Sequence, residues 1–507
     1  MRHGVSSRTT SYSIRRTARR ILCDAGQLAV VGGVIALGAA LVAALWDRDM
    51  QVALVFGLSG LGQLALFGVC RSLAPKEVNP YSTASAIALG WLLVAVVSAG
   101  PLWIVGGTRA VAVSYATIDG ALFESMSAFT STGLSLATVE PGLPHSIQLW
   151  RSLAQWAGGL GMVFFALMVI KSKGRSRDLV TQEMDDHALG DDVDASVVTI
   201  LTAYATITVV TMVGFVVTGM PWWEAINHGL TAVSTGGMTL TSASFSDYGT
   251  GPKLVAMGAM LAGAVSFSVY ALALRERKPS AIYRSTQVRA LLTILVGGGL
   301  MLMAALHHAG ASVAPLDVAF EWVSAVTTCG FSAVTLNEWP TLPLALVIGA
   351  MIVGASAGST AGGIKLARIQ WLLKRVQHWL LHEAAPVPDV DDPTYTWDGK
   401  EVSEEDADDN VAEAGVMATV WLMTLGVSIP IIAALEGDAS WRAIMFDATS
   451  ALGGVGLSAG LVSSELAPST KVVMSIMMWL GRLEIVSVFA LFLSPVAMTR
   501  RRMSTSG

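Results

Sequence analysis

Charged residues and cysteines are both scarce in this chain. Charged residues make up 14% of the 507 positions, and there are three cysteines, whereas a soluble domain carries roughly 25% charged residues. Cys23, Cys70 and Cys329 provide neither a disulfide framework nor the spacing of a metal site. By contrast, 53% of the residues are hydrophobic, and several runs are long enough to cross a bilayer of about 30 Å. This balance excludes a soluble globular protein and predicts an all-α polytopic membrane protein.

About ten apolar runs are predicted to span the membrane. They lie at residues 22–46, 52–70, 84–105, 149–170, 196–219, 254–274, 290–306, 342–364, 414–435 and 472–495. If the N-terminus is cytoplasmic, 25 of the 32 Lys and Arg residues fall on the cytoplasmic side, six fall outside, and Arg482 lies within a span. The positive-inside rule therefore predicts that both termini are cytoplasmic.

One predicted cytoplasmic segment is strongly acidic. Residues 383–413 are rich in Asp and Glu, for example at Asp391, Asp392, Glu404 and Glu405, and hold one Lys, Lys400, and no Arg. Such a composition is typical of a solvated, partly disordered linker. The alternative is a docking surface for a cytoplasmic partner.

A nine-residue pattern occurs four times on the predicted outer side. It reads Ser/Thr, Ala, apolar, three variable residues, Gly, apolar, Ser/Thr, and it covers residues 127–135, 231–239, 324–332 and 450–458. The glycines are Gly133, Gly237, Gly330 and Gly456, and the residues nine positions before them are Glu124, His228, Glu321 and Asp447. The predicted unit is a span, a half-length helix, a small-residue loop and a second span.

The chemistry of this pattern suits a loop that lines an ion path. Non-helical backbone survives at membrane depth only where it lines water or is buried in protein. Glycine allows the positive φ that turns carbonyls inward, and carbonyls and hydroxyls together replace the hydration shell of a monovalent cation. The C-terminal end of each half-length helix would direct its partial negative charge at the ion. Four pseudo-symmetric repeats around one axis therefore predict a cation pore; the alternative is four ordinary glycine-rich turns. The predicted ion-binding residues are Thr130, Ser131, Thr132, Gly133, Ser234, Thr235, Gly236, Gly237, Thr327, Thr328, Cys329, Gly330, Gly453, Gly454, Val455 and Gly456.

Three further stretches carry a resemblance to a known family. They are GWLLVAVVSAGP at 90–101, IVGASAGSTAGGIK at 352–365 and LGRLEI at 480–485. With the four loops, they resemble the Trk/Ktr/HKT superfamily of cation transporters. Two spans before the first repeat resemble the bacterial TrkH/TrkG type of potassium-uptake subunit.

The resemblance implies a pseudo-fourfold pore, with glycine at all four filter positions favouring potassium. It also implies a homodimer with one pore per subunit and a cytoplasmic, nucleotide-binding, TrkA-like regulatory subunit. The implied divisions are a basic N-terminus with two additional spans (1–80), pore repeat 1 (81–175), pore repeat 2 (190–276), pore repeat 3 (285–382), the acidic linker (383–413) and pore repeat 4 (414–507).

Small residues at 354–363, named here the gate segment, interrupt one predicted span. The alternative to a gate is close helix packing through small residues. A nucleotide-binding P-loop is excluded, because Ile364 separates Gly363 from Lys365. Arg482 is predicted either to hold helices together or to place its guanidinium in the pore below the filter. The predicted gate residues are Gly354, Ala355, Ser356, Ala357, Gly358, Ser359, Thr360, Gly362, Gly363 and Arg482.

The polar residues before the loops, Glu124, His228, Glu321 and Asp447, are predicted to brace the filter by hydrogen bonds, with direct ion binding as the alternative. The overall prediction is potassium uptake by a multi-pass protein of the bacterial inner membrane, in contact with lipids and without nucleic acid. K⁺ is the substrate; no enzyme activity and no cofactor are expected in this chain, and ATP, ADP or NAD(H) is expected only on the regulatory partner. The alternatives are a sodium- or proton-coupled symporter and a less selective cation channel.

Overall fold

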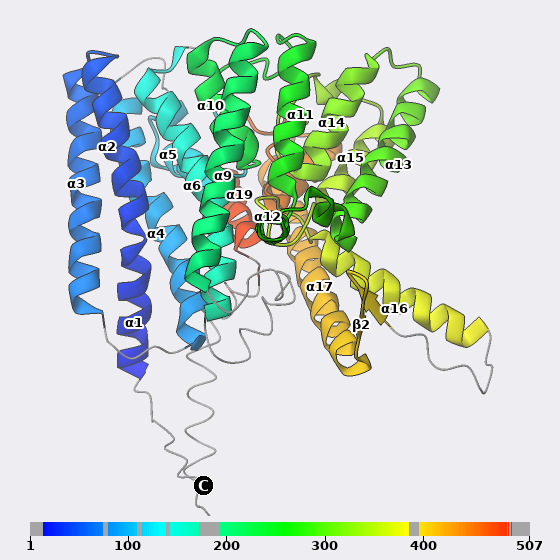
Figure 1. Cartoon of the computed structure of the whole chain (residues 1–507). Helices are drawn as coiled ribbons and strands as arrows, with labels where there is room; N and C mark the ends of the chain where they lie inside the picture. The colour runs from blue at the N-terminus through cyan, green and yellow to red at the C-terminus, as the bar shows by residue number, and fades with distance from the viewer. Residues whose placement is uncertain are drawn as a thin grey trace, which may run out of the picture.

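The computed structural model is a bundle in which long and short helices stand side by side (Figure 1). It describes residues 14–74, 80–108, 114–137, 142–171, 193–384 and 395–483, together with Ile485 and Val488. Within these residues six helices are long and apolar enough to cross a membrane, and a bent helix pair would make a seventh. The predicted all-α polytopic fold is confirmed.

The first three helices form one edge of the bundle (Figure 1). They are α1 (Ile14–Gln27), α2 (Ala29–Leu45) and α3 (Met50–Leu73). Asp49 caps the N-terminus of α3. Its carboxylate accepts hydrogen bonds from the N–H groups of Gln51 and Val52, both at 3.1 Å. Gly33 and Gly60 face each other across the pair, where an added Cβ on either glycine would lie 3.0–3.1 Å from the other's carbonyl oxygen. Small residues thus allow the close helix packing that is common in membranes.

Four further groups of helices share one order, in which a long helix precedes a short, buried helix and a loop. The first group is α4 (Pro80–Gly106), α5 (Ile118–Phe129) and α6 (His145–Lys171); the second is α9 (Val193–Val217), α10 (Trp222–Val233), α11 (Thr250–Ala264) and α12 (Phe267–Glu276). The third is α13 (Thr286–His308), α14 (Pro315–Thr327), α15 (Thr341–Val353) and α16 (Leu366–Ala384); the fourth is α17 (Glu404–Leu435), α18 (Trp441–Gly453) and α19 (Pro468–Arg482). Short 3₁₀ helices, η3 (Pro279–Arg284) and η4 (Leu336–Glu338), lie in the connections.

The short helices have local reasons to begin where they do. The hydroxyls of Thr117 and Ser440 cap α5 and α18 by accepting the N–H groups of Gly120 and Ala443. Pro315 occupies the first position of α14, where its missing N–H has no helical partner to lose. All four short helices are mostly buried, whereas long helices such as α3 and α9 present Leu and Val side chains outward.

Two of the predicted spans are wrong as continuous helices. The span at 254–274 bends by 88° between α11 and α12, at a break formed by Val265 and Ser266. The span at 342–364 ends as a helix at Val353, and the gate segment that follows is not helical. Most of the predicted span at 472–495 beyond Arg482 lies outside the described residues.

The acidic segment at 383–413 was expected to be a solvated linker, but residues 395–413 are folded. Strands β1 (Tyr395–Trp397) and β2 (Lys400–Val402) form an antiparallel hairpin, and Ser403 caps the N-terminus of α17 by accepting the Asp406 N–H at 3.1 Å. The acidic residues at 404–406 occupy the first turn of α17, where they complement the helix dipole. Residues 385–394 lie outside the described ranges.

Candidate ion pathway

The four predicted filter loops meet one another in a closed ring, named here the filter ring. An added Cβ on Gly133 of loop 1 would collide with the carbonyl oxygen of Gly236 in loop 2. An added Cβ on Gly237 of loop 2 would likewise collide with the carbonyl oxygen of Cys329 in loop 3. The remaining contacts place Gly330 of loop 3 against the Val455 carbonyl of loop 4, and Gly456 against the Thr132 carbonyl of loop 1. Each pattern glycine therefore packs on the residue before the glycine of the next loop, and the sequence of contacts closes after four steps.

The loops also share one backbone conformation. The fifth residue of each pattern has a left-handed φ, with values of 51°, 48°, 53° and 61° at Ser131, Thr235, Thr328 and Gly454. The pattern glycines have φ values of 94°, 74°, 92° and 97° at Gly133, Gly237, Gly330 and Gly456. Non-glycine residues reach this region only at a cost. The recurrence of glycine at the seventh position is therefore required both by backbone conformation and by the close contact with the next loop.

The first residue of the pattern ties each loop to its own helix. In three repeats its hydroxyl accepts the N–H of the pattern glycine, from Gly133 to Ser127 at 3.1 Å, and at 3.0 Å in the repeats of Ser324 and Ser450. In the second repeat the Gly237 N–H instead donates to the Thr231 carbonyl at 3.5 Å. In the first, third and fourth repeats this contact explains why the pattern begins with a hydroxyl-bearing residue.

The polar residues predicted as braces each lie against the outer end of their own loop. The Glu321 carboxylate accepts the Ser332 hydroxyl at 2.9 Å and the Ala333 N–H at 2.5 Å. The Asp447 carboxylate accepts the hydroxyl of Ser458 and the N–H groups of three residues that follow it. The Glu124 carboxylate accepts the Ser135 hydroxyl at 2.9 Å and the Leu136 N–H at 3.2 Å. These contacts support bracing rather than ion binding: both oxygens of Glu124 and of Asp447 accept hydrogen bonds, whereas in Glu321 only Oε1 does so and Oε2 has no partner among the described residues.

In the second repeat, the imidazole of His228 takes the place of the brace carboxylate. Its Nδ1 lies 2.9 Å from the Glu224 carbonyl oxygen, which only accepts, so Nδ1 carries the proton. The unprotonated Nε2 then accepts the Leu240 N–H at 3.4 Å. Leu240 stands at the same pattern position as Leu136 and Ala333, so a neutral histidine replaces a carboxylate as the acceptor.

Removing a brace is expected to destabilise the protein. Asp447→Ala would leave the buried N–H groups of Ala459, Leu461 and Val462 without an acceptor, at about 1–3 kcal/mol for each unsatisfied group. We expect the thermal midpoint of the purified protein to fall by several degrees. Asp438→Ala, at an exposed position just before α18, is the matched control and is expected to leave the midpoint unchanged; an equal fall in both variants would contradict the bracing role.

Two residues of α6 that the sequence analysis missed join the first two loops. The Arg151 guanidinium donates to the Glu124 carboxylate at 2.8 Å, to the Thr239 carbonyl at 3.2 Å and to the Ser135 hydroxyl at 3.0 Å. One turn further on, the Gln155 side chain donates to the Gly236 carbonyl at 2.5 Å and accepts the Met238 N–H at 3.0 Å. Their spacing of four residues places both side chains on one helix face. This spacing was the only sign in the sequence that the two residues act together.

Several predicted filter hydroxyls are committed to protein groups. Thr130 and Thr327 donate to carbonyls four residues earlier in their own helices, both at 2.7 Å. Ser131 donates to the Gln155 carbonyl at 2.6 Å, and the Cys329 thiol lies 3.9 Å from the Ala232 carbonyl. The side chains at these positions therefore hold the loops together.

A cavity of about 400 Å³ opens on one side of the filter ring. It is lined by all four pattern glycines and by hydroxyl-bearing residues such as Ser135, Ser332 and Ser458. Arg151 also lines this cavity, with its side chain 2% exposed. The ring is thus reached through a polar vestibule rather than an apolar one.

The gate segment lies directly against the other side of the ring. The Gly362 N–H donates to the Thr328 hydroxyl at 2.6 Å, and the Gly363 N–H donates to the Gly453 carbonyl at 3.0 Å. The Thr360 hydroxyl donates to the Gly263 carbonyl at 2.9 Å and lies within hydrogen-bond distance of the Val233 carbonyl as well. The segment therefore contacts the second, third and fourth groups of helices at once.

The break between α11 and α12 packs on the gate segment. The Ser356 N–H donates to the Ala264 carbonyl at 3.2 Å, and the Phe267 N–H donates to the Gly358 carbonyl at 3.1 Å. This bend has no signal in the sequence, because the residues around it are uniformly apolar or small. Two helix breaks, in the second and third groups, thus support each other under the ring.

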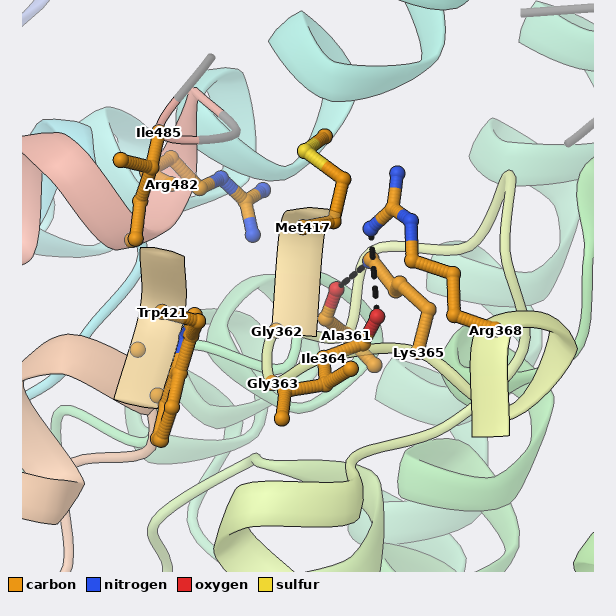
Figure 2. A pocket seen from close by; sticks show the side chains of 13 residues that line it. Ala361, Gly362, Gly363, Ile364, Lys365, Arg368, Met417, Trp421, Arg482 and Ile485 are labelled. Carbon is orange, nitrogen blue, oxygen red and sulfur yellow. Dashed lines mark hydrogen bonds between the residues drawn. The ribbon is translucent and has the colours of Figure 1, made fainter. Parts of the chain in front are cut away.

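Arg482 joins the gate segment to α6. Its guanidinium donates to the Thr360 carbonyl at 2.6 Å and to the Gly158 carbonyl at 2.8 Å, while Nε has no hydrogen-bond partner among the described residues. Next to it lies a cavity of about 30 Å³, which Lys365, Arg368 and Met417 also line (Figure 2). This volume holds about one or two water molecules.

The remaining predicted gate residues lie in the same buried segment. Ala355, Ser356, Ala357, Ser359 and Thr360 are all at most 2% exposed. Gly354, Gly358 and Gly363 have φ values of 69°, 71° and 76°. The helix interruption comes from this run of left-handed glycines. The small residues also pack closely, since an added Cβ on Gly362 would collide with the Gly453 carbonyl oxygen, so both the gate and the close-packing interpretation remain predictions.

Comparison with known proteins gives one consistent result. A family model described as TrkH, a cation transport protein, matches residues 76–500. An uncharacterized cation transporter of Methanocaldococcus jannaschii is 30% identical over 434 residues, which are 84% of this chain and 85% of that protein. The Trk system potassium uptake protein TrkH of Halomonas elongata is 28% identical over 506 residues, 94% of this chain and 98% of that protein.

A solved structure has the same fold. The crystal structure of the potassium transporter TrkH from Vibrio parahaemolyticus matches with a TM-score of 0.80 and 22% sequence identity, and the match covers 95% of this chain and 98% of that chain. The family model covers most of the sequence. The chain belongs to the TrkH family of cation transport proteins.

Proposed function

We propose that the protein takes up potassium across the cytoplasmic membrane through the filter ring. The observation that carries this proposal is the ring's closure, in which each pattern glycine packs on a carbonyl-bearing residue of the next loop. Four equivalent backbones around one axis supply carbonyl oxygens for a dehydrated monovalent cation. The Trk system relatives are named as potassium uptake proteins, which favours potassium as the cation.

The four groups of helices would act as four pore repeats around this axis. Potassium would enter the polar vestibule, lose water at the ring and stop at the gate segment until that segment moves aside. Uptake needs no chemical step in this chain, because the membrane potential supplies about 2.3 kcal/mol per charge per 100 mV. The protein is therefore proposed as a transporter and not an enzyme.

Arg482 is proposed to act with the gate segment as the barrier on the inner side of the ring. A buried positive charge raises the energy of a cation passing close to it. Its two hydrogen bonds hold Thr360 and α6 together across the pathway. The same side chain would thus raise the electrostatic barrier and keep the segment in place.

The assembly is proposed from the family. We infer a homodimer with one pore per subunit in the bacterial inner membrane, with both chain termini cytoplasmic. A TrkA-like cytoplasmic subunit would bind the nucleotide and control the gate segment. Both α16 and α17 project from the bundle on the side away from α10 and α14 (Figure 1), which suits a cytoplasmic contact.

The proposal is tested by rubidium-86 uptake into liposomes that contain the purified protein, with and without its regulatory subunit. An inside-negative potential should drive uptake, and potassium should compete far better than sodium or lithium. Empty liposomes are the control. Uptake that requires a sodium or proton gradient would favour the coupled symporter, and equal competition by sodium would favour the less selective channel.

A further inference from the structure

The cytoplasmic hairpin is attached firmly to α16. Its two-residue turn, Asp398-Gly399, has φ values of 49° and 79°, the left-handed pair that a tight hairpin turn requires. The Trp397 ring stacks on Trp371 of α16, with centroids 4.8 Å apart and planes 8° from parallel. The Lys374 ammonium lies 5.2–5.5 Å from the centroids of both rings. These contacts attach the hairpin to α16.

The tip of this hairpin caps a different helix. The Asp398 carboxylate accepts the N–H of Thr286, the first residue of α13, at 2.5 Å, and the Asp398 N–H donates to the Thr286 hydroxyl at 3.0 Å. Ser285, which precedes α13, makes no side-chain capping bond. A carboxylate at a helix N-terminus satisfies an otherwise unpaired N–H and complements the helix dipole. Asp398 thus supplies the missing cap across 112 residues of sequence.

The next residue of α13 holds the gate segment. Gln287 is buried, and its side-chain oxygen accepts the Ala357 N–H at 2.7 Å. A further tie comes from α16, where Gln370 donates to the Thr286 carbonyl at 3.2 Å. Neighbouring residues of one helix end therefore contact the cytoplasmic hairpin on one side and the gate segment on the other.

We propose that Asp398, Thr286 and Gln287 form a clasp through which the cytoplasmic hairpin controls the gate segment. The inference rests on the proposed function, since it assigns a regulator to the same gate. With the clasp closed, Gln287 holds Ala357 in the packed position under the filter ring. A displacement of the hairpin releases the first turn of α13, and with it the hydrogen bond to Ala357.

The first test compares two substitutions of Asp398. Asp398→Gly keeps the left-handed turn and removes the carboxylate, whereas Asp398→Asn keeps both the turn and an acceptor oxygen. We expect Asp398→Gly to raise rubidium uptake without the regulatory subunit by about fivefold, the effect of one net hydrogen bond, and Asp398→Asn to remain close to the wild type. Equal uptake in both variants and the wild type would overturn the clasp.

A double substitution separates coupling from general loosening. Gln287→Leu should raise the same basal uptake, and Asp398→Gly combined with Gln287→Leu should raise it no further than the larger single effect, because both act through one contact chain. Independent, multiplying effects would contradict a single clasp.

A readout that does not depend on transport distinguishes this inference from the proposed function. Ala357→Cys, in a Cys70→Ser background that leaves only the buried native thiols Cys23 and Cys329, would report exposure of the gate segment by its rate of thiol labelling. Asp398→Gly should raise that rate about fivefold, and Asp398→Asn should not. An unchanged rate would refute the clasp even if uptake is normal, whereas a raised rate without any uptake would support the clasp and refute the transport proposal.

Discussion

Gly330→Ser is expected to lower rubidium uptake at least tenfold and to let sodium compete with potassium. Gly330 has a φ of 92°, and an added Cβ would meet the Val455 carbonyl oxygen and lie 2.9 Å from the Cα of Gly456. The left-handed backbone alone costs a non-glycine residue about 1–2 kcal/mol, and the contact with loop 4 cannot relax without moving the ring. Uptake with competing potassium, sodium and lithium measures both effects.

The matched control for this variant is Gly349→Ser. Gly349 lies on α15 in the same group of helices, is exposed, and has no atom within 4 Å of an added Cβ. It should retain wild-type uptake and competition. If Gly330→Ser behaves like Gly349→Ser, the loops do not form the ion-selective part of the pathway.

Arg482→Gln is expected to raise basal uptake about tenfold. The substitution removes a buried positive charge that lies beside the gate segment. A unit charge at about 6 Å in an effective dielectric of about 20 opposes a cation by roughly 3 kcal/mol, of which a water-filled opening would screen part. Rubidium uptake without the regulatory subunit provides the measurement.

Arg482→Lys separates charge from hydrogen bonding. Lysine keeps the positive charge but cannot reproduce the two-pronged contact with Thr360 and Gly158. We expect Arg482→Lys to keep uptake low while Arg482→Gln raises it. An equal increase in both variants would assign the barrier to the hydrogen bonds, and an equal loss would make Arg482 a purely structural tie between α6 and the gate segment.

The repeated pattern predicted much of the site because each of its positions has a local cause. The seventh position has a positive φ, which favours glycine. The hydroxyl at the first position accepts the N–H of that glycine. The side chain nine positions before the glycine accepts the N–H of the tenth residue of the pattern. These contacts lie within about a dozen residues of sequence, so a periodic pattern records them. The break in the helix at the gate segment could also be predicted locally, because several glycines follow one another there within an apolar span.

Contacts between residues far apart in the sequence could not be predicted from the repeated pattern. Arg151 joins loops 1 and 2 across 88 residues, and its charge in isolation indicated only an outer position. The bend between α11 and α12 depends on the gate segment that packs against it. The folded hairpin could not be predicted from composition, because the high acidic content of 383–413 indicated a disordered linker. The stacking of Trp371 on Trp397, which holds the hairpin, is a contact that composition does not reveal.

The most direct test of the central claim, that the filter ring carries potassium down its electrochemical gradient, is the reversal potential of the reconstituted protein. With potassium on one side of the bilayer and sodium on the other, a potassium-selective ring predicts a reversal potential close to that of potassium alone, independent of pH. A reversal potential near zero, or one that shifts with an imposed proton gradient, would contradict the account.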